Sequence, residues 1–246
     1  SVAQPTQRAD WTTPFLLQAR TIELPGEQAL ETYPDGTGLF TSQARDSEGF
    51  PVVAWYDRSE GKLWSTRFSE AGFLRPSLVA GWGHAEPSLN GDMGANVHVA
   101  LDQNDALHFC FQDGNTDSLR YLAPTLDHNE WIDDGVWIDT GGRGQALHVV
   151  GDDCQVLFDS DDSPLVIYQD ATQQALLMRR RNRATVDGAL GWSGRVGLRA
   201  DLGSTPRGYG FYASGVVLND ELWVGHLVYD RDEASEGYYE ILKVEL

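Results

Sequence analysis

The amino-acid sequence predicts an all-β protein with the architecture of a four-bladed β-propeller, and three observations support this prediction. The chain contains eight Trp, nine Tyr, nine Phe and 26 Gly residues, a composition typical of many short strands joined by tight turns. Four similar segments recur along the chain at intervals of 56, 57 and 60 residues. The two ends of the chain together supply the strands of one blade, which would close a ring of four antiparallel, four-stranded blades.

The composition excludes several classes of protein. The chain has 246 residues, with 18 Lys and Arg against 37 Asp and Glu, so its net charge is −19. A surface of this sign repels phosphate groups, which argues against a nucleic-acid partner. No apolar run reaches the roughly 18 residues that a membrane-spanning helix requires. A hydrophobic content of 41% is too high for a disordered chain.

The repeat carries most of the information about the fold. Each copy starts with Asp or Asn and ends, eleven positions later, with Tyr-Asp or Gln-Asp, and in three copies a Leu follows six positions further on. A period of this length, filled with strand-forming residues, is typical of propeller blades rather than of helical repeats. The copies are residues 46–57, 102–113, 159–170 and 219–230, and the Leu residues are Leu63, Leu119 and Leu176.

Four strands are expected in each copy. The first is short and rich in small residues, as in residues 97–101, and a polar turn follows it. The second is apolar on both faces, as in residues 165–169, which suits a strand packed between two neighbouring blades. The third begins at the repeated Leu. The fourth is predicted at residues 78–81, 136–139 and 196–199.

The two chain ends are expected to close the ring. The fourth copy ends at Leu246 after its third strand, whereas Phe15–Leu24 forms a spare strand before the first copy. Pairing of Phe15–Leu24 with Tyr239–Val244 would complete the last blade and hide the edges of the sheets. The predicted boundaries of this single domain are a tail at 1–12 and blades at approximately 26–83, 84–142, 143–203, and 204–246 plus 13–25.

A family resemblance follows from the first copy. Residues 46–63 show the pattern Asp-x-x-Gly-x-Pro-x-x-Ala-x-Tyr-Asp and then Gly-x-Leu, which resembles the repeat of secreted bacterial β-propellers. Such repeats occur in sialidase-like, lectin-like and uncharacterised surface proteins, so the resemblance implies propeller blades without specifying a function. The sialidase motif Ser-x-Asp-x-Gly-x-Thr-Trp is absent from the sequence, which argues against sialidase activity.

The acids that close the four copies are candidates for a metal site. Carboxylates repeated around a ring could coordinate Ca²⁺ together with backbone oxygens. An Asp at the end of a strand also caps a hairpin by accepting hydrogen bonds from its own backbone, and this interpretation is favoured for the closing and the opening acids alike. No cofactor is required. The candidate metal ligands are Asp57, Asp113, Asp170 and Asp230.

One face of the predicted ring is the candidate binding surface. The loops between blades should lie on the same face as the turns between strands two and three. Aromatic side chains mixed with carboxylates suit a sugar or peptide ligand, although an ordinary loop surface has the same composition. His98, on an inner strand, could point into the channel, where a hydrogen-bonded histidine is favoured over a metal ligand. The candidate ligand-binding residues are Tyr33, His84, Asp92, His148, Asp152, Arg207, Tyr209 and Tyr212.

The sequence contains no nucleophile elbow, phosphate loop or His-Glu-x-x-His motif, so an enzyme is not the favoured hypothesis. The favoured one is a secreted or cell-surface module that binds a glycan or a protein through the loop face. One alternative is a glycoside hydrolase or lyase with carboxylates over the central channel. Another is a structural subunit of a larger extracellular assembly.

The expected location is extracellular, at the cell surface or in the periplasm. The sequence begins with Ser-Val-Ala, without Met or an apolar run, which predicts a mature or excised product that has lost its signal peptide. Cys110 and Cys154 could form one disulfide, as in an oxidising compartment, or could be two buried thiols. Their spacing does not decide between these alternatives.

Overall fold

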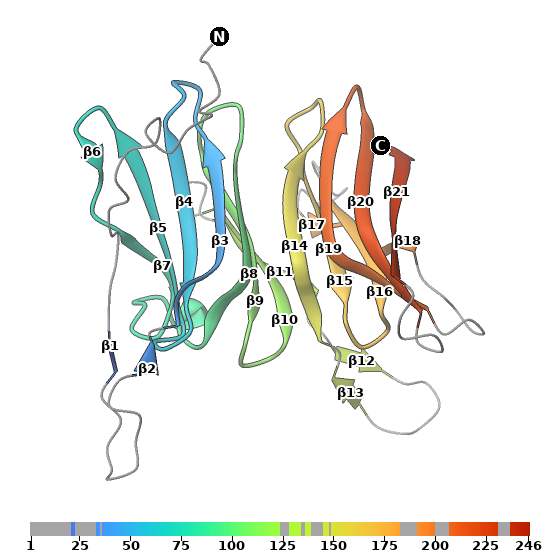
Figure 1. The fold of residues 1–246 in the computed structure, drawn as a ribbon, viewed down its shortest axis with the longest axis horizontal. Helices are drawn as coiled ribbons and strands as arrows, with labels where there is room; N and C mark the ends of the chain where they lie inside the picture. The colour runs from blue at the N-terminus through green and yellow to red at the C-terminus, as the bar shows by residue number, and fades with distance from the viewer. Residues whose placement is uncertain are drawn as a thin grey trace.

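Four antiparallel sheets, here called blades 1 to 4, follow one another along the chain (Figure 1). In each blade the first, second, third and, where it is present, fourth strand pair in chain order, so every blade is a meander, as the repeat predicted. The computed structural model describes residues 21–22, 33–34, 36–123, 128–133, 136–138, 145–147, 149–182, 191–199, 207–230 and 237–246.

The blades have the following strands. Blade 1 contains β3 (Thr37–Arg45), β4 (Pro51–Asp57), β5 (Lys62–Ser69) and β7 (Ser77–Gly81), and β6 (Gly72–Phe73) also pairs with β5. Blade 2 contains β8 (Met93–Leu101), β9 (Leu107–Asp113), β10 (Ser118–Ala123) and β11 (His128–Asp133). Blade 3 contains β14 (Val150–Phe158), β15 (Pro164–Asp170), β16 (Ala175–Asn182) and β18 (Val196–Arg199), and β17 (Gly191–Trp192) also pairs with β16. Blade 4 contains β19 (Arg207–Leu218), β20 (Glu221–Asp230) and β21 (Gly237–Glu245).

The first strands of the blades, β3, β8, β14 and β19, lie next to one another in the middle of the molecule (Figure 1). We call them the inner strands. The loops that lead into them meet the turns between strands two and three: the N–H of Met93 donates to the oxygen of Gly61 at 3.3 Å, and the N–H of Tyr209 donates to the oxygen of Gln174 at 3.0 Å. The prediction that these two sets of connections share a face is therefore confirmed.

The fourth strand of blade 2 is not the predicted one. Residues 128–133 (β11) pair with β10, whereas β12 (Val136–Ile138) pairs with β13 (Gln145–Leu147) in a separate two-stranded sheet. A shorter connection between adjacent antiparallel strands costs less chain entropy to close. The predicted fourth strands at 78–81 and 196–199 are confirmed as β7 and β18.

The predicted pairing of the chain ends is wrong for the part of the N-terminal strand that the structure describes. β1 (Thr21–Ile22) pairs with β2 (Tyr33–Pro34), and the described partner of β21 is β20. The pairing of β1 with β2 closes a loop of about ten residues, whereas pairing of β1 with β21 would close a loop of more than 200. The shorter loop costs less chain entropy to close. The rest of Phe15–Leu24 lies outside the described residues. Among the residues that are described, four similar blades are present, and no strand pairing joins blade 4 to blade 1.

The hydrophobic core lies between the blades. One buried cluster joins blades 1 and 2, a second joins blades 2 and 3, and a third joins blades 3 and 4. β15 is buried along its whole length, which confirms the prediction that the second strand packs between two neighbours. Each buried Leu, Ile or Phe contributes about 1.5–3 kcal/mol to this packing.

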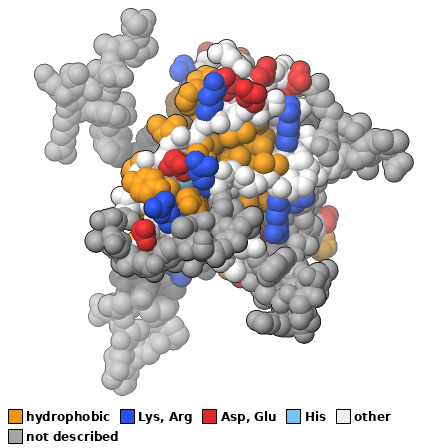
Figure 2. Space-filling view, turned by 90° about the vertical axis from the view of Figure 1, so that its right-hand side faces the viewer, with side chains coloured by type: hydrophobic (Ala, Val, Ile, Leu, Met, Phe, Trp, Pro, Cys, Tyr) orange, Lys and Arg blue, Asp and Glu red, His pale blue; other side chains and the backbone are white. Residues whose placement is uncertain are grey.

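The far face of blade 4, turned away from blade 3, has no neighbouring blade among the described residues. Leu222 and Val224 of β20 point into the cluster shared with blade 3, while Trp223 between them is half-exposed. Tyr239 and Ile241 of β21 are 74% and 72% exposed. Figure 2 views the molecule from the side of β21 and shows hydrophobic side chains gathered in the middle, with basic and acidic side chains around them.

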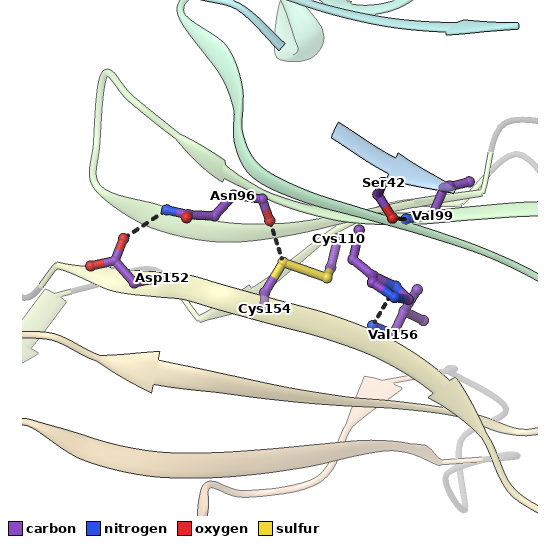
Figure 3. Close-up of a disulfide and its surroundings, with 8 residues drawn as sticks. Ser42, Asn96, Val99, Cys110, Asp152, Cys154 and Val156 are labelled. Atoms are coloured by element: carbon purple, nitrogen blue, oxygen red, sulfur yellow. Dashed lines mark hydrogen bonds between the residues drawn. A yellow bond between two sulfur atoms is a disulfide. The ribbon is translucent and has the colours of Figure 1, made fainter. Parts of the chain in front are cut away.

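A disulfide joins Cys110 of β9 to Cys154 of β14 and so connects blade 2 to blade 3 (Figure 3). Their Cα atoms lie 6.3 Å apart, within the usual range for a disulfide. Both residues are buried in the cluster between these blades. Of the two alternatives that the sequence left open, the structure has the disulfide.

Candidate functional site

Every inner strand contains the same break in its backbone. A glycine with positive φ is followed two positions later by a second residue in the left-handed region, and the pairing with the next strand shifts register on both sides of it. The glycines are Gly38, Gly94, Gly151 and Gly210, and the left-handed residues are Phe40 (φ 49°), Asn96 (φ 54°), Asp153 (φ 48°) and Tyr212 (φ 52°).

Packing of one blade on the next explains the glycine and the repeated Leu together. A Cβ on Gly94 would lie 2.8 Å from the Cβ of Leu63 in the third strand of blade 1. Gly151 lies against Leu119, and Gly210 against Leu176, in the same way. Because this position needs both a positive φ and close approach to a neighbour, glycine is required there.

Left-handed backbone is unfavourable for Phe and Tyr, at a cost of roughly 1–2 kcal/mol per residue, whereas Asn and Asp tolerate it. Phe40 is 47% exposed and Tyr212 is 71% exposed, so burial of the rings does not repay this cost. Backbone strain of this kind concentrates at functional sites. The four bulges therefore mark a candidate ligand site on the inner strands.

The bulges surround a pocket of about 280 Å³ to which all four inner strands contribute. We call it the channel pocket. Its volume is close to the lower limit of small-molecule sites, about 300 Å³. The described lining consists of Phe40, Thr41, Asn96, Val97, His98, Asp153, Cys154, Gln155, Ala213 and Ser214.

His98 presents a neutral imidazole to this pocket. The backbone N–H of Val156 donates to its Nδ1 at 3.3 Å, so Nδ1 carries no proton and Nε2–H is the donor. Burial lowers the pKa of His98 from 6.5 to about 4, because it disfavours the charged ring. The side chain is therefore an uncharged hydrogen-bond donor at neutral pH.

Asp153 is held by the next blade. Its Oδ2 accepts the backbone N–H of Tyr212 at 2.7 Å, and its Oδ1 has no hydrogen bond to any described residue. Burial raises the pKa of Asp153, and the hydrogen bond from Tyr212 opposes this shift. Asp153 therefore offers the pocket one fixed acceptor oxygen.

Asp152 does not line the pocket itself but contacts Asn96, which does. Its Oδ1 accepts Asn96 Nδ2–H at 2.9 Å, and Sγ of Cys154 lies 3.2 Å from the backbone oxygen of Asn96 (Figure 3). Burial and the neighbouring Asp153 and Asp117 raise the pKa of Asp152. With its amide nitrogen held in this way, Asn96 presents Oδ1 as a free acceptor.

A further series of hydrogen bonds ties each inner strand to the next. Ser42 Oγ accepts the N–H of Val99 at 3.0 Å (Figure 3), and His98 Nδ1 accepts that of Val156. Gln155 Oε1 accepts the N–H of Gly215 at 2.6 Å, which fixes the orientation of its amide. The Nε2 hydrogens of Gln155 have no partner among the described residues, so they can serve a ligand in the pocket.

The structure brings two of the eight predicted ligand-binding residues, Asp152 and Tyr212, to this site. Arg207 lies 3.8 Å from Asp230, and the backbone oxygen of Tyr209 accepts Gln169 Nε2–H. Asp92 Oδ1 accepts a hydrogen bond from the Tyr56 hydroxyl at 2.5 Å. Burial of the ring raises the pKa of Tyr56, and this hydrogen bond raises it further. His84 lines another cavity, Tyr33 lies in β2, and His148 lies outside the described residues.

Sequence reasoning missed Phe40, Asn96, Asp153 and Gln155. The signal that could have found the first three is the recurrence of Gly38, Gly94, Gly151 and Gly210 at intervals of 56, 57 and 59 residues. His98, which the sequence indicates could point into the channel, lines the pocket, and its ring is hydrogen-bonded to Val156.

The closing acids of three copies cap hairpins. Asp57 Oδ1 accepts the N–H of Glu60 at 3.1 Å, Asp113 Oδ1 accepts that of Asn115 at 3.0 Å, and Asp170 Oδ1 accepts that of Gln173 at 2.8 Å. Asp230 instead faces Arg207. Within the described residues no three His, Cys, Asp or Glu side chains form a group that could hold a metal ion. Calcium binding stays a prediction, which a calcium-dependent rise in Tm would support.

A larger cavity of about 560 Å³ lies between blades 1 and 2. Six of its fourteen described lining residues are aliphatic and eight are polar or charged, among them Arg67, His84 and Glu86. Only two blades form it, and the bulges of the inner strands do not reach it. The channel pocket, which all four inner strands and their bulges form, is therefore the candidate site.

No family model matches the chain, and no curated protein matches it significantly. Among solved structures, the chain is similar to the α-L-arabinofuranosidase Arb93A from Fusarium graminearum in complex with an iminosugar inhibitor. The TM-score is 0.53 at 13% identity over 91% of this chain and 66% of that one. A thermostable family-43 glycoside hydrolase gives a TM-score of 0.48 at 10% identity, over 86% of this chain and 70% of that one.

The similarity to Arb93A shows the fold alone, which is all-β and β-propeller-like. The chain spans about two thirds of the length of the two structures. Among the described residues, no helix is long and apolar enough to cross a membrane.

Proposed function

We propose that this protein binds a carbohydrate in the channel pocket. The observation that carries the proposal is the fourfold bulge of the inner strands, which places Phe40, Asn96, Asp153 and Tyr212 at equivalent positions around one pocket or at its margin. A sugar ring offers hydroxyl groups that both donate and accept, and apolar faces that stack on aromatic rings. The lining supplies a matching set of groups.

The hydrogen-bonding groups of the pocket are of both kinds. Donors are the His98 Nε2–H and the Gln155 Nε2 hydrogens, and acceptors are the Oδ1 atoms of Asn96 and Asp153. Thr41 donates to the backbone oxygen of Gly38 at 2.7 Å, so its hydroxyl oxygen is a further acceptor. Because inter-blade hydrogen bonds already hold His98, Gln155 and Asp153, little side-chain entropy is lost when a ligand binds.

Binding is favoured over hydrolysis as the function of this pocket. Glycoside hydrolysis generally uses two carboxyl groups, roughly 5–9.5 Å apart, on either side of the scissile bond. The described lining supplies the carboxylate of Asp153, and Asp152 is engaged by Asn96. That Arb93A is an arabinofuranosidase captured with an iminosugar supports a carbohydrate as the class of ligand. The disulfide supports a location in an oxidising compartment, outside the cytoplasm.

The experiment is a binding screen of neutral mono- and oligosaccharides, arabinose and galactose among them, followed by calorimetry with variants. Phe40→Asn and Tyr212→Asn remove the aromatic rings but keep a residue that tolerates the left-handed backbone. Tyr239→Asn is the matched control, because Tyr239 is as exposed as Tyr212 but lies on β21.

We expect Phe40→Asn or Tyr212→Asn to weaken binding by roughly two- to tenfold or more, since an aromatic contact contributes about 0.5–1.5 kcal/mol beyond the area it buries. Tyr239→Asn should leave the affinity unchanged. Equal affinities for all three variants and the wild type would exclude the channel pocket as the site, and release of free sugar from an oligosaccharide would favour the hydrolase instead.

A further inference from the structure

We propose that the channel pocket prefers a saccharide that carries a protonated amine and rejects one that carries a carboxylate or sulfate, and that Asp153 makes this distinction. The proposal rests on the carbohydrate-binding function and specifies the class of ligand. It follows from the charges of the lining, the free oxygen of Asp153 and the fixed state of His98.

Asp153 is the one charged side chain in the described lining of the pocket. The described lining contains no Lys or Arg to balance it, and the only histidine there, His98, is neutral above a pKa of about 4. The His98 ring cannot readily become cationic, because its Nδ1 already accepts the N–H of Val156 and its surroundings are buried. The described lining therefore contains one acidic group and no basic group that is charged at neutral pH.

The carboxylate is also geometrically prepared to receive a cation. The N–H of Tyr212 fixes Oδ2, while Oδ1 has no hydrogen bond to a described residue. Burial makes the ionised form of Asp153 costly, and this cost raises its pKa. An ammonium group placed at Oδ1 would form a charge-assisted hydrogen bond and offset that cost, whereas an anionic group there would add repulsion.

The neutral groups do not cancel this selectivity. The free donors of His98 and Gln155 can bind sugar hydroxyls, but neither carries a charge that would hold an anion. The net charge of −19 on the chain adds a general repulsion of anions. The same net charge attracts any cation to the protein. The experiment therefore includes a variant that removes one negative charge outside the pocket, which separates this general attraction from the effect of Asp153.

The probes are two series of methyl glycosides with the same rings: glucoside, glucosaminide and glucuronide, and the corresponding galacto compounds. Binding is measured by calorimetry and ligand-observed NMR near pH 6.5, where the amines are mostly protonated, in about 0.15 M salt, which limits surface attraction to about 8 Å. In at least one series we expect the aminoglycoside to bind about tenfold or more tightly than the neutral glycoside. The uronide should not bind measurably.

Asp153→Asn tests the residue itself. Asn stands at the equivalent left-handed position of blade 2, as Asn96, so the backbone tolerates the change. The variant should bind the amine no more tightly than the neutral glycoside, and the readout is the ratio of these two affinities, because the substitution also removes an acceptor that a neutral sugar can use. Gln155→Glu is the second variant: its carboxylate can still accept the N–H of Gly215, and the added charge should increase the preference for the amine.

Asp105→Asn is the matched control. Asp105 is also left-handed, and it also accepts a backbone N–H from another blade, that of Ser47 at 2.9 Å. It lies in the turn at the far end of β8, so its replacement removes the same charge from the chain without touching the pocket. The preference for the amine should survive this change.

Three results would overturn the proposal: a uronide that binds as tightly as the amine, a preference that persists in Asp153→Asn, or a preference that Asp105→Asn abolishes equally. Failure of the proposed function would look different, because then no glycoside of either series, charged or neutral, would bind to the pocket.

Discussion

The backbone N–H of Tyr212 in blade 4 donates a 2.7 Å hydrogen bond to Oδ2 of Asp153 in blade 3. Both residues occupy the left-handed position of their inner strands, one step of the repeat apart. The same bulge that exposes the aromatic ring of Tyr212 therefore also fixes the carboxylate beside it. Contacts of this kind, from one blade to the next, lead to four predictions about stability.

The stability of the protein should depend on pH through His98. Its pKa in the folded state is about 4, below the ordinary 6.5, because burial disfavours the charged ring. The folded state therefore binds this proton less readily than the unfolded state, so the contribution to stability is complete above about pH 6.5 and is lost as the pH falls toward 4. His98→Gln removes this titration and can keep the acceptor for Val156, as Gln155 does for Gly215.

The measurement is the free energy of unfolding of wild type and His98→Gln between pH 7.5 and 4.5. The advantage of the wild type over the variant should shrink by on the order of 2 kcal/mol over this range, less than the full shift implies because the ring is partly accessible. If the free energies of unfolding of wild type and His98→Gln change by the same amount over this pH range, the pKa of His98 is not lowered in the folded state.

Two glycines at equivalent positions should differ in their tolerance of alanine. Gly94 and Gly38 both have positive φ, but a Cβ on Gly94 would meet Leu63 at 2.8 Å, whereas nothing lies within 4 Å of a Cβ on Gly38. Gly38→Ala should cost about 1–2 kcal/mol from the backbone alone, and Gly94→Ala roughly 1–3 kcal/mol more from overpacking. Urea unfolding measures both, and equal losses would contradict the blade contact.

The two faces of blade 4 should respond differently to truncation. Leu222→Ala removes a fully buried side chain of β20 from the cluster between blades 3 and 4 and should cost about 2–5 kcal/mol. Ile241→Ala, on the far face, should cost less than about 0.5 kcal/mol. If chemical denaturation shows a large loss for Ile241→Ala, another part of the chain or a second molecule covers that face in solution.

Loss of the disulfide should destabilise the contact between blades 2 and 3. Cys110 and Cys154 are 44 residues apart in sequence, and closing a loop of this length is worth about 4 kcal/mol in the chain-entropy estimate. The Cys110→Ala/Cys154→Ala variant should lose about 2–4 kcal/mol of unfolding free energy. Alkylation of the unreduced, denatured protein should add no mass, and two alkyl groups per chain would show that the thiols are free.

Local patterns in the sequence were enough to predict the blades. Apolar runs predict β4, β9, β15 and β20 as the second strands. β9 and β15 lie between two neighbouring blades, and they are buried along almost their whole length because both of their faces are apolar. The Asp at the end of three of these strands was predicted as a hairpin cap, and the contacts of Asp57, Asp113 and Asp170 have that form. Each of these features depends on residues that are close together in the chain.

The sequence by itself determined the repeat, its strand order and the position of the interior. The tertiary structure decided the composition of the pocket, because Phe40, Asn96, Asp153 and Tyr212 are separated by 56 to 59 residues and meet through the packing of one blade on the next. It also decided the pairing of Thr21–Ile22 with Tyr33–Pro34. The physical reason is that a left-handed bulge changes which face of a strand a side chain occupies, and periodicity alone cannot locate such a change.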